Sequence, residues 1–531
     1  MFLRIRFIRC KNRKISPPFQ GGRCPVDIEP ASVEDKGWLI LITFTIEMKR
    51  EEKIFYAVLS ICTLWLAYII FSADATFDKG DGIQHYLISR YSWTHSELFL
   101  HHWGKPFFIL LSSPFSQFGI IGTSIFNLLC AALSAWCAYK IANRFEIKLA
   151  WTIPILLFFS TIYFAVINSG LTEPLFGLVL IAGIYLFIEK KFIFSALLIS
   201  FLPFVRSEGF MLLPLFGAML LYRKKFTAIP LLAAGTFIYS IIGGIALKDF
   251  LWIWTQNPYK GAYNVYGHGE LLHFIKQYNQ IWGGILFVLF GAGCLLFLIQ
   301  LWKRKKEIPL LRFVYGKPND SLLMEELVLI YGCFGIYFLA HTFFWWKGIY
   351  SSLGLVRVIA GVMPLSALIC LRAIAGISEV FDWNKVLRII VLSVVLLLVI
   401  KAPFFQWYFP FQLEGEERVA VEVGKWFEHS EYKNNTLYYL QPYLTIALNI
   451  DPFDKKRVTE LWWLNEDIKN NAVPKTAIIF WDTHYGPNEC KLKPELFDDT
   501  TKFKLLKRFL PYKIFKTLGG YDYEIRVYET K

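Results

Sequence analysis

Two aspartates stand in a polar segment, residues 73–119, that separates two long apolar runs. Asp78 and Asp81 lie three residues apart, just before an amphipathic stretch at residues 83–91. A carboxylate in such a place can act as a general base and take a proton from a hydroxyl group. We expect Asp81 to be this base and keep Asp78 as the second candidate. The alternative is that both carboxylates only cap the helix that follows.

Four cations are candidates for binding an anion on the same side of the protein. They are Lys105, Arg206, Lys347 and Arg357. Guanidinium groups bind phosphate through two parallel hydrogen bonds, and an ammonium binds it as a point charge. A base combined with such cations suits a group transfer in which a phosphate departs. Each cation could instead be an interfacial anchor, with its stem in lipid and its charge in water.

Six further residues are candidates for contacts with a substrate: His101, His102, Glu173, Glu208, Trp481 and Asp482. Adjacent residues on a helix diverge by about 100°, so the neighbouring histidines do not form a pair of metal ligands. We expect no metal site and no required cofactor. Dependence on a divalent metal ion is the alternative. The tryptophan and aspartate end a predicted strand, where sites of α/β folds often form. The alternative for all of these residues is that they belong to ordinary polar loops. For Trp481 and Asp482 this loop would include a turn at Gly486-Pro487.

The composition indicates whether the chain lies in water or in a membrane. Of the 531 residues, 55% are hydrophobic and 18% are charged, and the mean hydropathy is +0.42. This is more apolar than a soluble protein of such length, for which about 45–50% is usual. The net charge is +14, but the basic residues form short clusters between apolar runs. We therefore predict a membrane protein that binds lipid and no nucleic acid.

Eleven apolar runs follow Met48 and are long or apolar enough to be counted as membrane crossings. They cover residues 54–72, 119–141, 149–168, 172–188, 192–205, 209–222, 226–247, 281–302, 326–344, 354–373 and 386–402. The short runs 192–205 and 209–222 could instead form one re-entrant hairpin. Both interpretations return the chain to the same side, so the predicted topology downstream is unchanged.

The loops give the orientation. Those on the side of Lys49 and Arg50 carry about twice as many Lys and Arg residues as those on the other side, which predicts a cytoplasmic N-terminus. The chain is then a multi-pass protein of the plasma (inner) membrane, with residues 403–531 outside. Both aspartates, the four candidate cations and all of the histidines fall on the outer side. Ionisable groups at the ends of membrane helices are costly, and they usually mark a site or a pathway.

Both ends of the chain are predicted to differ from the membrane domain, residues 48–402. Residues 1–47 have no sustained periodicity, and we interpret them as an unstructured or mis-annotated extension before a start at Met48. In the tail, residues 415–430 have one apolar helical face. Strands are expected at residues 437–440, 477–481 and 521–529. The predicted fold is an all-α polytopic membrane domain, followed at residues 403–531 by a small outer α/β domain.

Several motifs resemble those of the GT-C superfamily of membrane glycosyltransferases, over roughly residues 53–402. The first is Asp81-Gly82 with Tyr86 and Arg90, followed by residues 101–108. The others are Asn168-Ser-Gly-Leu-Thr-Glu173-Pro174, Arg206-Ser-Glu208-Gly209, and Ser351 to Arg357 with Met363-Pro364-Leu365. Two departures stand out. Ser207 follows Arg206 where the family has proline, and His102-Trp103 stands where a proline pair is common.

This resemblance implies an activity as well as a fold. The chain would move a sugar from a polyprenyl-phosphate donor to a glycan, lipid or protein acceptor on the outer face, with inversion and an aspartate base. A transporter or flippase of lipid-linked glycans is the alternative, although no internal repeat is evident and the ionisable residues gather at one face. A noncatalytic membrane scaffold is the third possibility, and it would need no acid in the first outer loop.

Overall fold

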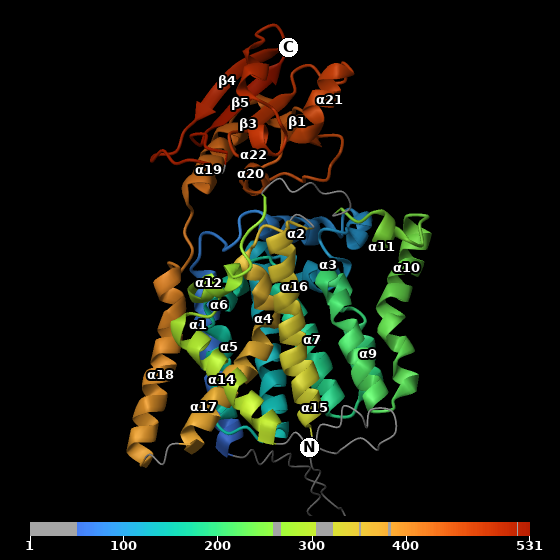
Figure 1. Ribbon diagram of the computed structural model, residues 1–531. Coiled ribbons are helices and arrows are strands. Elements are labelled where there is room, and N and C mark those ends of the chain that lie inside the picture. Colours follow the sequence, from blue (N-terminus) through green and yellow to red (C-terminus); the bar gives the residue numbers. More distant parts are fainter. Residues whose placement is uncertain (1–49, 259–266, 304–321, 350–351, 381–383, 518) are drawn as a thin grey trace, which may run out of the picture. The chain divides into compact units, whose positions relative to one another are not determined.

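The computed structural model describes residues 50–258, 267–303, 322–349, 352–380, 384–517 and 519–531 (Figure 1). The predicted extension 1–47 and the predicted start at Met48 lie outside these residues. Residues 55–531 belong to one compact unit. All of the contacts below lie within this unit.

Seven helices in the described residues are long and apolar enough to cross a membrane. They are Arg50–Phe71 (α1), Gly119–Arg144 (α4), Phe226–Ala246 (ending in α10, Ala234–Ala246), Gly284–Lys303 (α14), Leu323–Lys347 (ending in α16, Cys333–Lys347), Val356–Ile377 (the 3-10 helix η9, Val356–Val362, and most of α17, Met363–Val380) and Lys385–Gln406 (α18). An eighth crossing results if α5 (Ile153–Phe158) and α6 (Thr161–Ile167), bent by 71°, form one span. The predicted all-α polytopic domain is therefore confirmed.

The other three predicted crossings form helices that are short for a span. They are Glu173–Ile188 (α7), Phe192–Phe204 (α8, Phe192–Ile199, and its 3-10 extension) and Ser207–Tyr222 (ending in α9, Leu213–Tyr222). By length, seven or eight of the eleven predicted crossings qualify. A further short apolar helix, α3 (Pro106–Ser116), lies in the segment predicted to be the first outer loop.

Proline explains where these helices begin. α5, α7 and α9 each have Pro at the first or second position, which needs no N–H donor there and has φ preset for a helix. The breaks before them leave backbone polar groups and charged side chains inside the helix bundle. Glu173 opens α7, and Arg206 precedes the helix that ends in α9. Such irregular backbone is tolerated at membrane depth only where protein or a polar cavity surrounds it.

The C-terminal region contains a five-stranded sheet in the order β2-β1-β3-β5-β4. β1 (Leu437–Tyr439) pairs in parallel with β2 (Val458–Glu460) and β3 (Ile478–Asp482), while β5 (Ile525–Thr530) is antiparallel to β3 and β4 (Phe503–Phe509). The other helices here are α19 (Gly415–Glu428), α20 (Pro442–Leu448), α21 (Leu464–Lys469) and α22 (Tyr485–Asn488). The predicted small α/β domain is confirmed, with its helix and three strands. The prediction missed β2 and β4.

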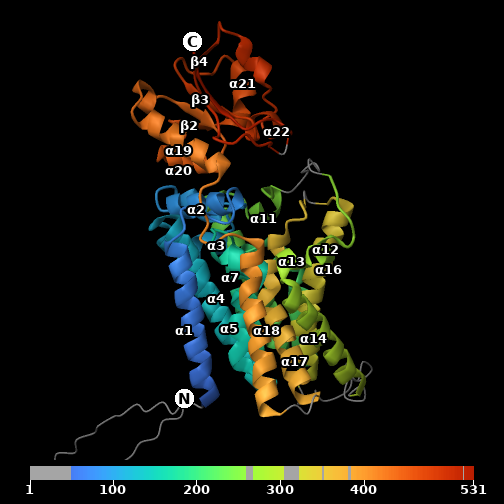
Figure 2. The ribbon, with the colours of Figure 1, turned by 90° about the vertical axis from the view of Figure 1, so that its left-hand side faces the viewer.

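A short helix of the membrane region, α2 (Asp81–Tyr91), lies under α20 in both ribbon views (Figures 1 and 2). Its residues Ile83, Tyr86 and Leu87 are buried in the same apolar cluster as Phe480 of β3 and residues of α19 and α20. The cluster therefore joins α2 to the C-terminal domain. We call the end of the helix bundle that carries α2 the site face.

Candidate functional site

Arg357 connects both candidate bases. Its Nη1 lies 2.9 Å from Asp78 Oδ2, and its Nη2 donates a hydrogen bond to Asp81 Oδ2. Asp81 opens α2, whereas Arg357 lies in η9, 276 residues later in the chain. The arginine side chain is only 10% exposed. A buried guanidinium is stable only with charged or hydrogen-bonded partners, and the two carboxylates supply them.

The two aspartates differ in what else they do. Asp78 Oδ1 accepts the backbone N–H of Gly82 at 2.7 Å, so Asp78 caps the first turn of α2. Asp81 makes no cap hydrogen bond and is 33% exposed. Burial raises the pKa of Asp81, but Arg357, with smaller effects of His85 and Arg206, more than offsets this and holds the pKa below its usual value. Asp81 is therefore ionised and accessible.

Arg206 is the centre of a second ion cluster. Its guanidinium lies 2.6 Å from Glu173 Oε1 and 2.8 Å from Glu208 Oε1, and it donates to Thr172 Oγ1 at 3.3 Å. His341 Nε2, from α16, is 3.5 Å from the same Glu208 oxygen. Three of the residues singled out in the sequence therefore meet here, at the two breaks that prolines create in the bundle.

Lys105 joins this cluster through Ser207. Its Nζ donates to Ser207 Oγ at 3.0 Å, and its backbone is left-handed, with φ of 64°. Burial lowers the pKa of Lys105 to about 8, with Glu208 opposing the shift. A cavity of about 140 Å³ adjoins both residues and is also lined by Pro203 and Trp252. Ser207, which stands where the GT-C motif has proline, thus accepts a hydrogen bond from Lys105, one of the residues predicted to bind phosphate.

His85 was not among the predicted site residues. It lies one helical turn after Asp81 on α2 and is 7% exposed. Its Nδ1 is buried without a hydrogen-bond partner. Burial lowers the pKa of His85 to about 3, and the charges that act on it are those of Asp81, Arg357, Lys105 and Arg206. The spacing of four residues from Asp81 was the signal in the sequence, because such residues share a helix face.

The remaining predicted residues of the membrane region have other partners. Lys347 is exposed, with its ammonium 3.8 Å from the centre of the Trp346 ring. His102 Nε2 lies 2.9 Å from the carbonyl oxygen of Ile253, beside Trp252. His101 Nδ1 accepts the N–H of Gly104 at 3.2 Å, which shapes the turn before Lys105. These contacts lie outside both ion clusters.

Trp481 and Asp482 are buried in the C-terminal domain. The indole of Trp481 is fully buried and donates to the carbonyl of Leu492 at 2.9 Å. Asp482 is 2% exposed, and its Oδ1 accepts the N–H groups of His484 and Tyr485. Burial raises the pKa of Asp482 to about 6. This placement contradicts the predicted sugar contact, because both side chains are enclosed by their own domain.

Among the described residues, no group of three His, Cys, Asp or Glu side chains is arranged to hold a metal ion. The two clusters at the site face are carboxylate–guanidinium pairs, with each arginine bound to two acids. Such a set can exchange protons and bind an anion through its own side chains.

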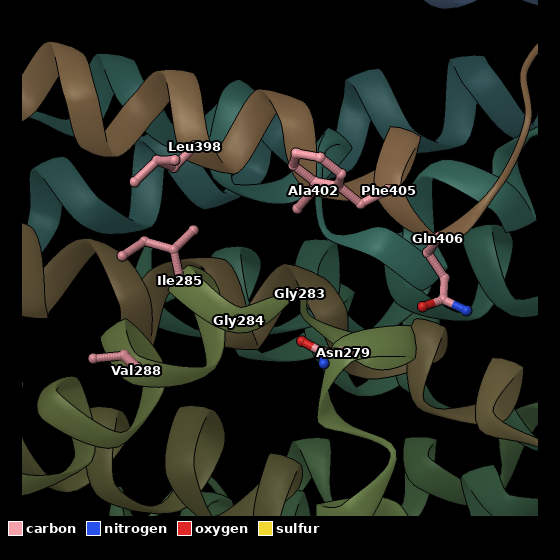
Figure 3. A pocket seen from close by; sticks show the side chains of 9 residues that line it. All are labelled: Asn279, Gly283, Gly284, Ile285, Val288, Leu398, Ala402, Phe405 and Gln406. Carbon is pink, nitrogen blue, oxygen red and sulfur yellow. The ribbon is translucent and has the colours of Figure 1, made fainter.

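A groove of about 510 Å³ opens between α18 and the start of α14 (Figure 3). Ile285, Val288 and Leu398 line its apolar part, and the amides of Asn279 and Gln406 lie together at its other end. Gln406 ends α18. The polar end adjoins the site on two sides. Asn279 belongs to α13 (Tyr278–Ile281), which packs against η9. Trp407, directly after Gln406, packs edge-on against Phe77, the neighbour of Asp78.

Comparison with known proteins shows the fold. No protein-family model matches the sequence, and no curated protein does. Among solved structures, ArnT from Cupriavidus metallidurans bound to undecaprenyl phosphate matches with a TM-score of 0.53 and 9% identity, over 90% of this chain and 97% of that chain. The apo state of ArnT also matches with a TM-score of 0.53, at 10% identity over 89% and 97%. The chain therefore has an ArnT-like fold, which confirms the fold predicted from the sequence.

Proposed function

We propose that this chain is a membrane glycosyltransferase that moves a sugar from a polyprenyl-phosphate donor to an acceptor hydroxyl. The observation that carries the proposal is the buried Arg357, held between Asp78 and the more exposed Asp81 at one face of an ArnT-like fold. ArnT binds undecaprenyl phosphate. The same fold with an anion-binding side chain beside a base supports a donor of this class. The acceptor would be a glycan, lipid or protein.

In the proposed reaction, the acceptor oxygen attacks C1 of the sugar from the side opposite the phosphate. The bond between C1 and the phosphate oxygen breaks, and its electron pair leaves with the polyprenyl phosphate. The proton of the acceptor hydroxyl moves to Asp81. Because the attack and the departure take place on opposite sides of C1, the configuration at C1 is inverted. Asp81 is the preferred base because Asp78 already binds the N–H of Gly82.

The cations of the site would stabilise the departing phosphate. Arg357 and Arg206 are both largely buried, where charge interactions are stronger than in water. Lys105 adds a third positive charge near Glu208. Because Arg357 now binds both aspartates, a phosphate that drew it away would remove the main cation beside Asp81. The pKa of Asp81 would then rise, and the base would become stronger when the donor is bound.

The groove between α14 and α18 fits the lipid part of such a donor. Its apolar side chains lie on two membrane helices, so the hydrocarbon chains of lipids are what would contact them in a bilayer. Its polar end adjoins η9, which contains Arg357, and Phe77, which directly precedes Asp78. An isoprenoid chain in the groove would therefore approach the ion pair from the membrane side.

The orientation in the membrane is proposed from the Lys and Arg bias of the loops. We place the site face and the C-terminal domain outside the plasma (inner) membrane, with a cytoplasmic N-terminus. A flippase would also need a polar path through the bundle. The clusters around Arg357 and Arg206 lie at the site face, and the other buried ion pairs, Arg223–Glu325 and Arg372–Glu326, are separate from them. A site at one end favours transfer over transport.

The deciding experiment is sugar transfer from a polyprenyl-phosphate donor by purified Asp81→Asn protein in lipid vesicles. Loss of a proton acceptor should lower kcat by about 10²–10⁴-fold. Asp78→Asn should retain far more activity, because an amide oxygen can still accept the N–H of Gly82. Full activity of Asp81→Asn would overturn the assignment of the base. A wild-type protein that moves lipid-linked sugar across the vesicle without transferring it would be a flippase.

A further inference from the structure

We propose that His85 is a phosphate ligand of the lipid donor, and that its Nδ1–H donates a hydrogen bond to a phosphate oxygen. The inference rests on the proposed transfer reaction and adds a residue to its site. The sequence places His85 on α2, four residues after Asp81, and the structure places both on the side of α2 that faces the ion clusters. Residues of this spacing lie on the same face of a helix.

The opposite face of α2 packs against the C-terminal domain. Ile83 and Leu87 are buried in the apolar cluster shared with the C-terminal domain. A helix turns by 100° per residue, so these two positions lie roughly opposite Asp81 and His85. The helix is thus held by its apolar face and presents the base and the imidazole together to the site.

His85 lacks the partner that a buried histidine normally has. Most buried polar groups in folded proteins are hydrogen-bonded, and an exception needs an explanation such as a functional role. The other buried histidine of the described chain, His341, also has a ring nitrogen without a hydrogen bond, but the carboxylate of Glu208 lies 3.5 Å from that nitrogen. The partly buried His95 and His273 have an acid and a carbonyl oxygen at 2.8 Å. Nδ1 of His85 is likewise buried with no hydrogen-bond partner.

The surroundings of His85 suit an anion. Three cations, Arg357, Lys105 and Arg206, act electrostatically on the imidazole, and the carboxylate of Asp81 opposes them. These three cations come from three separate segments: η9, the turn before α3, and the break before α9. Burial keeps the imidazole neutral, so it adds a donor without adding a fourth positive charge. A phosphate bound by these cations would satisfy the orphan nitrogen.

The test uses two replacements that differ in one property. His85→Asn keeps an N–H donor near the position of Nδ1, and His85→Leu has similar bulk without a donor. The affinity of purified protein for a polyprenyl phosphate would be measured, together with KM and kcat for the sugar donor. We expect His85→Leu to weaken polyprenyl phosphate binding by about 10- to 100-fold, as for a lost hydrogen bond to a charged group. His85→Asn should stay within about threefold of wild type.

Two further variants complete the design. His429→Leu removes an exposed histidine of the C-terminal domain and should change neither binding nor transfer. Asp81→Asn should lose transfer while it still binds polyprenyl phosphate, which tests the reaction separately from the ligand. Thermal unfolding of each variant shows whether the fold is intact.

The outcomes separate this proposal from the wider one. Unchanged affinity in His85→Leu with a lower kcat would overturn the phosphate contact and assign His85 to proton transfer with Asp81. Equal losses of affinity in the Asn and Leu variants would overturn it in favour of a packing role. Wild-type protein that binds no polyprenyl phosphate would overturn both the His85 assignment and the proposed function.

Discussion

The hydroxyl of Tyr91, at the end of α2, donates a hydrogen bond of 3.0 Å to the backbone carbonyl of Ile450 in the C-terminal domain. Close by, His95 Nε2 lies 2.8 Å from Asp451 Oδ2. At the other end of α2, Lys79 Nζ lies 2.7 Å from Glu414 Oε2. Both ends of the helix that carries Asp81 are therefore held by the C-terminal domain. This domain positions the candidate base although it contributes no residue to the two ion clusters.

Loss of packing under α2 should impair the site from a distance. Leu87 is 3% exposed in the shared apolar cluster, so Leu87→Ala should lower the free energy of unfolding by about 2–5 kcal/mol. Transfer should fall as well, because α2 then no longer holds Asp81 firmly. Thermal unfolding and transfer rates of the purified protein measure both effects. Leu505→Ala is the matched control, since Leu505 is 48% exposed on β4. A Leu87→Ala protein as stable as this control would contradict the shared core.

Replacement of Arg357 should change the pH dependence of transfer. Arg357 is the main cation that lowers the pKa of Asp81, and Asp81 must be ionised to act as a base. In Arg357→Gln the pKa of Asp81 rises, so the acid limb of kcat/KM moves to higher pH. The maximal rate should also fall by about 10²-fold or more, because a charged phosphate ligand is lost. Lys347→Gln is the control, as Lys347 contacts Trp346. An unshifted acid limb in Arg357→Gln would contradict the Asp81–Arg357 relationship.

Asp482 should make the C-terminal domain less stable as the pH rises. Burial raises its folded pKa to about 6, above the value of about 3.9 expected when unfolded. A group with a raised folded pKa gives stability that is complete below the unfolded pKa and is lost as the pH rises through the folded one. The free energy of unfolding should therefore fall between about pH 4 and pH 6. His484 acts in the same direction, because its hydrogen bond to Glu416 raises its pKa.

Asp482→Asn isolates this effect. The amide oxygen can still accept the N–H groups of His484 and Tyr485, but it carries no charge. The variant should therefore show a weaker fall in stability over the same pH range. Denaturant unfolding at pH 4.5 and pH 7, followed by hydrogen exchange of the backbone amides of β3, would measure it. The same pH dependence in both proteins would show that Asp482 is not its source.

The sequence contained the elements of the site but only part of its geometry. Apolar runs and prolines located the helices, because length and the missing N–H of proline are local properties. The approach of Arg357 to Asp81 depends on packing between segments 276 residues apart, and no local pattern encodes it. The role of Trp481 was wrong for a related reason. An aromatic residue at the end of a strand looks the same in sequence whether it faces a ligand or, as here, the core.

The groove between α14 and α18 gives a prediction about chain length. Val288 lines the groove and is 62% exposed, so Val288→Trp should fill its apolar part without disturbing the helix core. KM for a long-chain polyprenyl donor should rise by about tenfold, which corresponds to about 1.4 kcal/mol of lost binding. A donor with only two isoprene units should be nearly unaffected, because a chain that short would not reach the tryptophan.

The control for this variant lies on the same helix. Leu295→Trp places an indole two turns further along α14, at a position that is 59% exposed and does not line the groove. It should leave KM unchanged for both donors, since it places the same indole on the helix surface but outside the groove. Equal increases of KM for long and short donors in Val288→Trp would show that the tryptophan perturbs the site itself. The groove would then not hold the lipid chain.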